Sequence, residues 1–182
     1  SQVLRQWSAN YSSAGTDEDY GIKIDASGNI YQVGELNANS SSADLILVKY
    51  NQSGAVLWSK TFNGTGNAQE DYPNLLIDQN GNPIIVCNSK NPGNIYSICA
   101  IKFNPVSGDT TWVRRWNGPG GAWAEYRRSV VDQSGNIYAG GLTAPTSGID
   151  ADGILVKWDN NGNLQWAHRH GPGNVTDWVD EF

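Results

Sequence analysis

Residues 44–58 read DLILVKYNQSGAVLW, which is a short apolar run, a polar turn and a second short run that ends in tryptophan. Both runs are rich in β-branched or aromatic residues and are bounded by Asp, Asn and Gly, which is typical of strands. The segment Asn51-Gln52-Ser53-Gly54 has turn chemistry, because glycine accepts positive φ and an asparagine side chain bonds nearby backbone groups. The stretch therefore predicts two antiparallel strands joined by a tight turn.

The same pattern recurs along the chain. Segments of one kind end in tryptophan at Trp7, Trp58, Trp112 and Trp166, which lie 51, 54 and 54 residues apart. Turns of the form Asp-x-x-Gly-Asn follow the first three tryptophans by 18 to 20 residues, at Asp25, Asp78 and Asp132. A lysine followed by an aromatic residue recurs at Lys49, Lys102 and Lys157. A period of about 50 residues indicates a repeat architecture.

Each repeat is predicted to hold four strands. In the first repeat these strands run from Tyr20 to Asp25, Asn29 to Glu35, Asp44 to Tyr50 and Ala55 to Phe62. Four-stranded antiparallel units of this length are typical of the blades of a β-propeller. The predicted fold class is all-β: a single partial β-propeller over residues 1–182, with three complete blades at roughly 19–62, 72–116 and 126–170.

The two ends match only parts of a repeat. Residues 1–11 match a fourth strand, and residues 176–182 match a first strand. A propeller ring needs at least about four blades to close. We therefore expect completion either by the remainder of a longer polypeptide or by copies of this chain.

Composition excludes several classes of partner. The chain has 182 residues with a formal net charge of −6, so it offers no basic footprint for a phosphate backbone, and nucleic acid is not an expected partner. The longest apolar runs fall far short of the roughly 20 residues of a membrane-spanning helix, so no membrane span is expected. Aromatic residues are plentiful and charge is low, which argues against a disordered chain.

Several segments of the repeat resemble the bacterial β-propeller repeat family known as SBBP repeats: residues 44–50 (DLILVKY), 58–64 (WSKTFNG), 70–72 (EDY) and 78–82 (DQNGN). The resemblance covers nearly the whole chain and recurs three times. It implies a propeller in a secreted or cell-surface protein, with a periplasmic location as the alternative. The second repeat departs from the pattern, because Pro83 enters its second strand and Cys87 replaces the glycine of Gly34 and Gly141.

The sequence predicts no cofactor and no metal site. A weaker likeness is to quinoprotein propellers, but Ser-Gly or Asn-Gly stands where their Thr-Gly turn precedes tryptophan, which argues against a quinone. The Asp-x-x-Gly-Asn turns resemble the start of an EF-hand loop, yet no bidentate Glu follows at the twelfth position, so we interpret them as hairpin turns. His168 and His170 lack the ligand spacing of a metal site.

Acidic and aromatic residues gather in the connections between repeats. These connections, and those between second and third strands, are long and variable, and such loops on a rigid scaffold often carry binding sites. Carboxylates accept hydrogen bonds from hydroxyl groups, and aromatic rings stack on the apolar faces of sugars. The candidate ligand-binding residues are Asp19, Tyr20, Asp71, Tyr72, Trp123, Glu125, Tyr126, Asp177 and Trp178. Two alternatives stay open: acids that bond backbone beside rings that fill gaps between blades, and a bound cation.

Three functions follow from this interpretation. The leading hypothesis is a non-catalytic, secreted or surface binding module that recognises a glycan or protein ligand on its long-loop face. The first alternative is a structural or scaffolding propeller segment of a larger surface or assembly protein. The second is a propeller glycan hydrolase or lyase, for which nothing singles out two carboxylates. No catalytic residue is predicted, since no nucleophile elbow, phosphate loop or dinucleotide fingerprint occurs.

Two further sets of residues carry structural expectations. Cys87 and Cys99 lie near the end of one strand and the start of the next, so antiparallel pairing can place them side by side. We predict a disulfide, with buried free thiols as the alternative. The repeated lysines are expected to pair with carboxylates while their stems are buried. The arginines are expected to be solvated or ion-paired and not to form one patch: Arg114, Arg115, Arg127 and Arg128.

Overall fold

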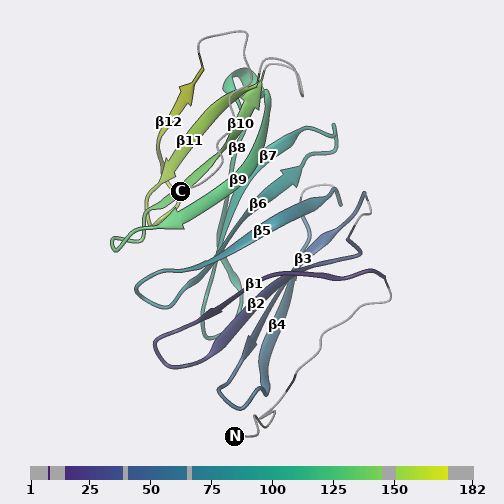
Figure 1. The fold of residues 1–182 in the computed structure, drawn as a ribbon, viewed down its shortest axis with the longest axis vertical. Helices are drawn as coiled ribbons and strands as arrows, with labels where there is room; N and C mark the ends of the chain where they lie inside the picture. The colour runs from purple at the N-terminus through teal and green to yellow at the C-terminus, as the bar shows by residue number, and fades with distance from the viewer. Residues whose placement is uncertain (1–7, 9–14, 39–40, 65–66, 145–150, 172–182) are drawn as a thin grey trace, which may run out of the picture.

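The computed structural model describes residues 8, 15–38, 41–64, 67–144 and 151–171, and these form an all-β structure of three four-stranded antiparallel sheets (Figure 1). The first sheet holds β1 (Glu18–Ile24), β2 (Ile30–Leu36), β3 (Asp44–Tyr50) and β4 (Val56–Phe62). The second sheet holds β5 (Glu70–Ile77), β6 (Pro83–Lys90), β7 (Tyr96–Phe103) and β8 (Thr110–Trp116). The third sheet holds β9 (Trp123–Val131), β10 (Ile137–Ala144), β11 (Asp152–Trp158) and β12 (Leu164–His170).

These sheets confirm the predicted all-β class and its three antiparallel units. The sheets begin at Glu18, Glu70 and Trp123, up to three residues before the predicted blades, because the first strand of each keeps pairing beyond a bulge. The one helix among the described residues is a 3₁₀ turn at Pro119–Gly121. No helix in the described part of the chain is long and apolar enough to cross a membrane. The predicted end strands, residues 1–11 and 176–182, lie outside the described residues apart from Ser8.

Asx turns join the first and second strands of each sheet. Asp25 Oδ1 accepts hydrogen bonds from the backbone N–H groups of Ser27 and Asn29, both at 2.9 Å, while Gly28 has a φ of 76°. The same arrangement recurs at Asp78 and Asp132, and also at Asp159, whose turn joins the third and fourth strands of the third sheet. The interpretation of these motifs as hairpin turns is confirmed.

The sheets pack face to face in chain order along the long axis of the molecule (Figure 1). We call the face toward the next sheet the forward face and the face toward the preceding sheet the rear face. Side chains alternate along β6, so Ile85 and Cys87 pack on the first sheet, whereas Ile84 and Val86 pack on the third. The second sheet is therefore buried on both faces.

Two of the repeated lysines, Lys49 and Lys102, join neighbouring sheets. Lys102 Nζ lies 2.8 Å from Asp78 Oδ2 in its own sheet and also donates to Asn160 of the next sheet. Lys49 Nζ lies 3.9 Å from Asp25 Oδ2 and donates to the carbonyl oxygen of Pro105 at 2.8 Å. The expected lysine–carboxylate pairs are confirmed at these two positions.

Candidate functional site

The first strands of the three sheets line one hollow of about 600 Å³, which we call the inner hollow. Its lining residues are Tyr20 of β1, then Tyr72, Pro73 and Asn74 of β5, then Tyr126, Arg127 and Arg128 of β9. A second hollow of about 430 Å³ lies farther along the same three strands and shares Asn74. Strands β1, β5 and β9 thus form one continuous wall, which is polar and aromatic at the inner hollow and largely aliphatic at the second hollow.

Bulges in these strands explain how neighbouring residues reach the inner hollow. The pairing register shifts between Asp19 and Gly21 in β1, between Asp71 and Asn74 in β5, and opposite Gly140 and Gly141 in β9. A bulge inserts one extra residue and re-aims the side chains beside it. Arg127 and Arg128 therefore both line the hollow, although consecutive residues of a regular strand face opposite ways.

The tyrosines of the first two sheets form the aromatic part of the site. The rings of Tyr20 and Tyr72 meet edge to face with centroids 6.0 Å apart. Tyr72 is 59% exposed and has a φ of 53°, a left-handed conformation that is unusual for a bulky residue. Its N–H donates to Glu35 Oε1 of the first sheet at 2.6 Å, which holds the strained residue in place.

Tyr126 plays a different part. Its side chain is buried, and its hydroxyl group shares a hydrogen bond of 3.0 Å with Ser129 Oγ. Its N–H donates to Asn88 Oδ1 of the second sheet at 2.6 Å, so Asn88 repeats the role of Glu35 at the next junction. Tyr126 is thus a packing residue at the hollow's wall, and Tyr72 supplies the accessible ring.

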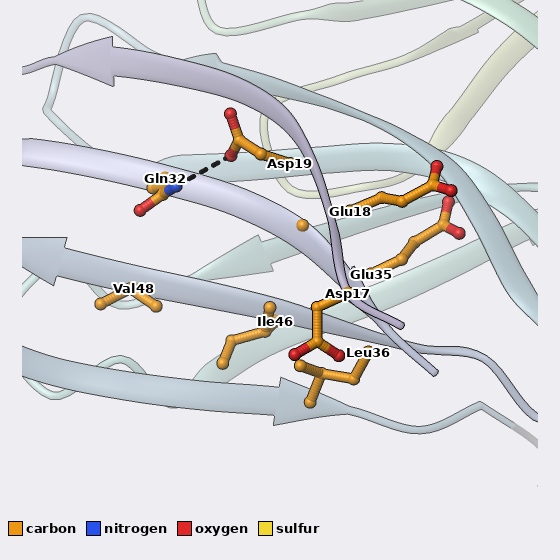
Figure 2. Close-up of a pocket in the computed structure, with 9 residues that line it drawn as sticks. Asp17, Glu18, Asp19, Gln32, Glu35, Leu36, Ile46 and Val48 are labelled. Atoms are coloured by element: carbon orange, nitrogen blue, oxygen red, sulfur yellow. Dashed lines mark hydrogen bonds between the residues drawn. The ribbon is translucent and has the colours of Figure 1, made fainter. Parts of the chain in front are cut away.

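Carboxyl groups lie next to the tyrosines of the first two sheets. Tyr20 donates from its hydroxyl group to Glu18 Oε2 at 3.2 Å, and Figure 2 shows the carboxylates of Glu18 and Glu35 directed to the same side. Burial, with the nearby charges of Asp71 and Glu18, raises the pKa of Glu35 to about 7. Burial likewise raises the pKa of Asp71 and of Glu125. The inner ends of the sheets therefore hold buried carboxyl groups whose pKa values lie above the ordinary range.

Asp71 is the most buried of the predicted acids that the structure describes. One of its carboxylate oxygens accepts a hydrogen bond of 2.8 Å from the hydroxyl group of Tyr96, and the other has no partner among the described residues. Asp71 holds the pKa of Tyr96 above its ordinary value, together with burial, which is the larger cause. Sequence reasoning missed Tyr96, because it opens β7 and lies far from the acidic connections along the chain.

The arginines divide into two separate groups, as expected. Arg127 Nη1 lies 2.5 Å from Glu125 Oε1, and Arg128 donates to the carbonyl oxygen of Arg127 at 3.0 Å. Arg114 instead bonds Gly162 O at 2.8 Å, and Arg115 bonds Ser89 Oγ at 3.2 Å. Only the pair on β9 lines the inner hollow.

The acid–aromatic pairs Asp19-Tyr20, Asp71-Tyr72 and Glu125-Tyr126 do not occupy equivalent positions in the three sheets. The residues paired with Glu35, Asn88 and Leu142 are Glu18, Asp71 and Glu125, so Glu18 and not Asp19 is the equivalent of the later acids. Asp19 occupies the position of Tyr72 and Tyr126 and accepts a hydrogen bond of 3.0 Å from Gln32 Nε2. The bulges that absorb the extra residue cause this shift.

The remaining predicted residues lie elsewhere. Trp123 is only 8% exposed and packs with Leu142, Ala144 and Ala151 in a separate apolar cluster, so it does not line the inner hollow. Asp177 and Trp178 lie outside the described residues. Several acids bond backbone, as one alternative expected: Glu70 accepts from the N–H of Gly64 at 2.8 Å. No cluster of three potential metal ligands occurs among the described residues.

The cysteines have the predicted register but are free thiols in the structure. Cys87 of β6 pairs directly with Cys99 of β7, and both side chains are fully buried. Burial, with Cys99 as its neighbour, raises the pKa of the Cys87 thiol well above its ordinary value. The disulfide itself stays a prediction.

Comparisons with known proteins find no match: no protein-family model fits the chain, and no curated protein is significantly similar to it.

Proposed function

We propose that this chain is a section of a β-propeller and acts as a non-catalytic binding module of a secreted or cell-surface protein. In this proposal the three sheets are blades, and β1, β5 and β9 are their innermost strands. The support is the face-to-face packing of the sheets in chain order and the continuous wall that these three strands form. Kinship with the SBBP repeats belongs to the same proposal and rests on the repeat residues.

The proposed ligand is a glycan or a protein segment bound in the inner hollow. The observation that carries this proposal is the exposed ring of Tyr72, held in a strained conformation beside Asn74 and Arg128. Strained residues in sparsely populated conformations cluster at binding and catalytic sites. An exposed ring with a guanidinium and a carboxamide beside it suits a ligand that has apolar faces and hydroxyl groups.

Catalysis gains no comparable support. A general acid needs a raised pKa, and Glu35 has one, but the residue is only 3% exposed and its carboxylate accepts a hydrogen bond from the backbone N–H of Tyr72. The raised pKa of Glu35 is therefore explained by its structural position between two sheets. A scaffolding role is the second candidate, and the half-exposed forward face of the third sheet favours it.

A glycan array followed by calorimetric titration with the best hit tests the binding proposal. Tyr72→Ala should weaken the affinity about tenfold, since one stacked ring contributes on the order of 1 kcal/mol. Arg128→Ala should weaken it as well. The matched control is Ile22→Ala, which removes an exposed side chain of β1 that does not line the inner hollow. Equal affinities for Tyr72→Ala and the folded wild type would contradict this site, and an array without hits would favour scaffolding.

A further inference from the structure

The described residues that line the inner hollow carry positive charge and no negative charge. They include two guanidinium groups, Arg127 and Arg128, and no carboxylate. The chain as a whole has a formal net charge of −6, so the cationic lining is a local feature of this hollow. Because opposite charges attract, the lining favours a ligand that carries negative charge.

The two arginines differ in how their charge is balanced. Arg127 Nη1 lies 2.5 Å from Glu125 Oε1, and this ion pair balances its charge. Arg128 is exposed, and its Nη1 donates at 3.0 Å to the carbonyl oxygen of Arg127, which carries no net charge. No carboxylate of the described residues forms an ion pair with Arg128. Arg128 is therefore the uncompensated cation in the described lining of the hollow.

The acids next to the tyrosines do not balance this charge. Glu18, Glu35 and Asp71 are all absent from the lining of the inner hollow. Glu35 and Asp71 are also buried, and Glu35 accepts a hydrogen bond of 2.6 Å from the backbone N–H of Tyr72. Burial raises the pKa of Glu35 to about 7, so part of this group is uncharged at neutral pH. A ligand in the hollow thus faces Arg128 and not these carboxylates.

Asn74 adds a hydrogen-bond acceptor to the same hollow. Its amide nitrogen donates to the carbonyl oxygen of Ser129 at 3.2 Å and to Ser129 Oγ at 3.1 Å. The first of these bonds fixes which side of the carboxamide is nitrogen, because a backbone carbonyl oxygen can only accept. The carboxamide oxygen accepts no hydrogen bond from any described residue. Asn74 Oδ1 is therefore left to accept a hydrogen bond from a ligand.

Tyr72 supplies an apolar surface beside these polar groups. The residue is 59% exposed, and Tyr20 meets it edge to face with ring centroids 6.0 Å apart, so Tyr20 covers at most one face of the Tyr72 ring. The hollow measures about 600 Å³, within the range of about 300 to 1,000 Å³ that is typical of small-ligand sites. It therefore offers a cation, an acceptor and an aromatic ring within one space of suitable size.

We propose that the inner hollow binds a sugar acid, which is a sugar ring that carries a carboxylate, as part of a glycan. The carboxylate lies against the guanidinium of Arg128, a hydroxyl group donates to Asn74 Oδ1, and the apolar face of the sugar stacks on Tyr72. Only Nη1 of Arg128 is engaged within the described chain, which leaves Nε and Nη2 to meet the two carboxylate oxygens in parallel. The inference rests on the proposed glycan-binding function and names the class of glycan.

The three contacts together favour a sugar acid over other ligands. A neutral sugar leaves Arg128 without a partner of opposite charge. The side chain of an acidic peptide provides the carboxylate, but it brings no hydroxyl group to Asn74 and no sugar face to Tyr72. A densely charged polyanion such as nucleic acid is repelled by the net charge of −6 that the chain carries. A ring with one carboxylate and several hydroxyl groups satisfies all three contacts.

Calorimetric titration with matched oligosaccharides tests the carboxylate contact. The probes are oligomers of galacturonate, glucuronate and mannuronate, together with sialyllactose. Each is paired with its carboxyl-reduced counterpart, in which an alcohol replaces the carboxylate. At low salt we expect at least one sugar acid to bind at least about tenfold more tightly than its reduced counterpart. The difference should shrink at high salt, because mobile ions screen the charge pair at this exposed arginine.

Two variants assign the preference to Arg128. Arg128→Gln should weaken binding of the sugar acid at least about tenfold and abolish its advantage over the reduced counterpart, since the guanidinium acts only on the carboxylate. Lys23→Gln is the matched control: it removes the same charge from an exposed position on β1 that does not line the inner hollow. The control should keep the full preference. Equal losses in both variants would show a general effect of charge and would overturn the contact with Arg128.

The outcomes separate this inference from the proposed function. Equal binding of the sugar acids and their reduced counterparts, with Tyr72→Ala still weakening both, would overturn the sugar acid and leave the glycan site intact. Tighter binding of a sulfated glycan without carboxylates, or of an oligoglutamate peptide, than of every sugar acid would also overturn it. No binding of any sugar in the panel would overturn the glycan ligand and this inference together.

Discussion

At the scale of single residues, Glu35 links charge to the packing of two sheets. It lies on β2, accepts a hydrogen bond from the N–H of Tyr72 on β5, and is nearly excluded from water. Burial is the main reason for its raised pKa, and the acids Asp71 and Glu18 add to it. The folded state therefore binds a proton at Glu35 more tightly than the unfolded chain does, so this residue favours folding most when it is protonated.

Glu35→Gln should consequently change how stability depends on pH. Between pH 4.5 and about 7 the wild type loses stability as pH rises, because only the folded state must give up a tightly held proton. A glutamine oxygen still accepts from Tyr72 without any charge. Urea unfolding should show the variant more stable by about 1 to 3 kcal/mol at pH 8 and nearly equal to the wild type near pH 4.5. A variant less stable at pH 8 would contradict the assignment.

Asp78→Asn supplies a contrast with the opposite sign. Hydrogen bonds from Lys102 and Asn82 outweigh burial and lower the pKa of Asp78, so its carboxylate stabilises the folded state above the unfolded value of 3.8. The variant should be less stable than the wild type at pH 8 and should approach it under acid conditions. If the stability of both variants, each measured relative to the wild type, changed with pH in the same direction, the two charges would not act as described.

At the scale of strands, the cysteine pair shows what sequence reasoning can establish. The positions of Cys87 and Cys99 relative to the ends of their strands predicted that they lie opposite each other, and β6 and β7 pair them directly. The prediction succeeded because the strands are bounded by clear turn residues and the register is regular throughout this pair. The backbone thus presents both sulfur atoms to one buried face.

Oxidation of this pair is the corresponding prediction. Neighbouring Cα atoms of paired antiparallel strands lie about 4.5 to 5.5 Å apart, within the range that a disulfide spans. Intact mass without reductant should show the loss of two hydrogens, and the oxidised protein should be more stable by about 3 kcal/mol for a loop of this length. Because burial raises the pKa of Cys87, the bond should form during folding and only slowly afterwards. Two alkylatable thiols in the unreduced, unfolded protein would refute it.

The irregular parts of the strands set the limit of prediction. Repeat period, turn chemistry and strand number followed from short local patterns, and Asp44–Tyr50 was predicted with its observed bounds. The bulges of β1, β5 and β9 were not predictable, since they depend on which residue the neighbouring sheet accommodates. For that reason the sequence did not show that Glu18, and not Asp19, is the equivalent of Asp71 and Glu125, and the roles of Glu35 and Tyr96 went unrecognised.

At the scale of the whole molecule, stability depends on contacts between neighbouring sheets. The second sheet packs against both others, so Ile84, Ile85, Ile98 and Ile101 are all fully buried. The third sheet is covered on its rear face, whereas its forward face keeps Tyr138 and Leu155 half-exposed. In stacked repeats stability is a sum of unit and junction terms, so units with fewer junctions open first.

Native-state hydrogen exchange should therefore separate equivalent strands that differ only in how their faces are covered. Strands β7 and β11 are each paired on both edges, and Ile101 and Val156 are equivalent and fully buried, so backbone pairing alone predicts equal protection. We expect the amide of Val156 to exchange about tenfold or more faster at low protein concentration, because the third sheet can open without the second. Equal exchange of both amides in the dilute protein would show instead that the three sheets open only as one cooperative unit.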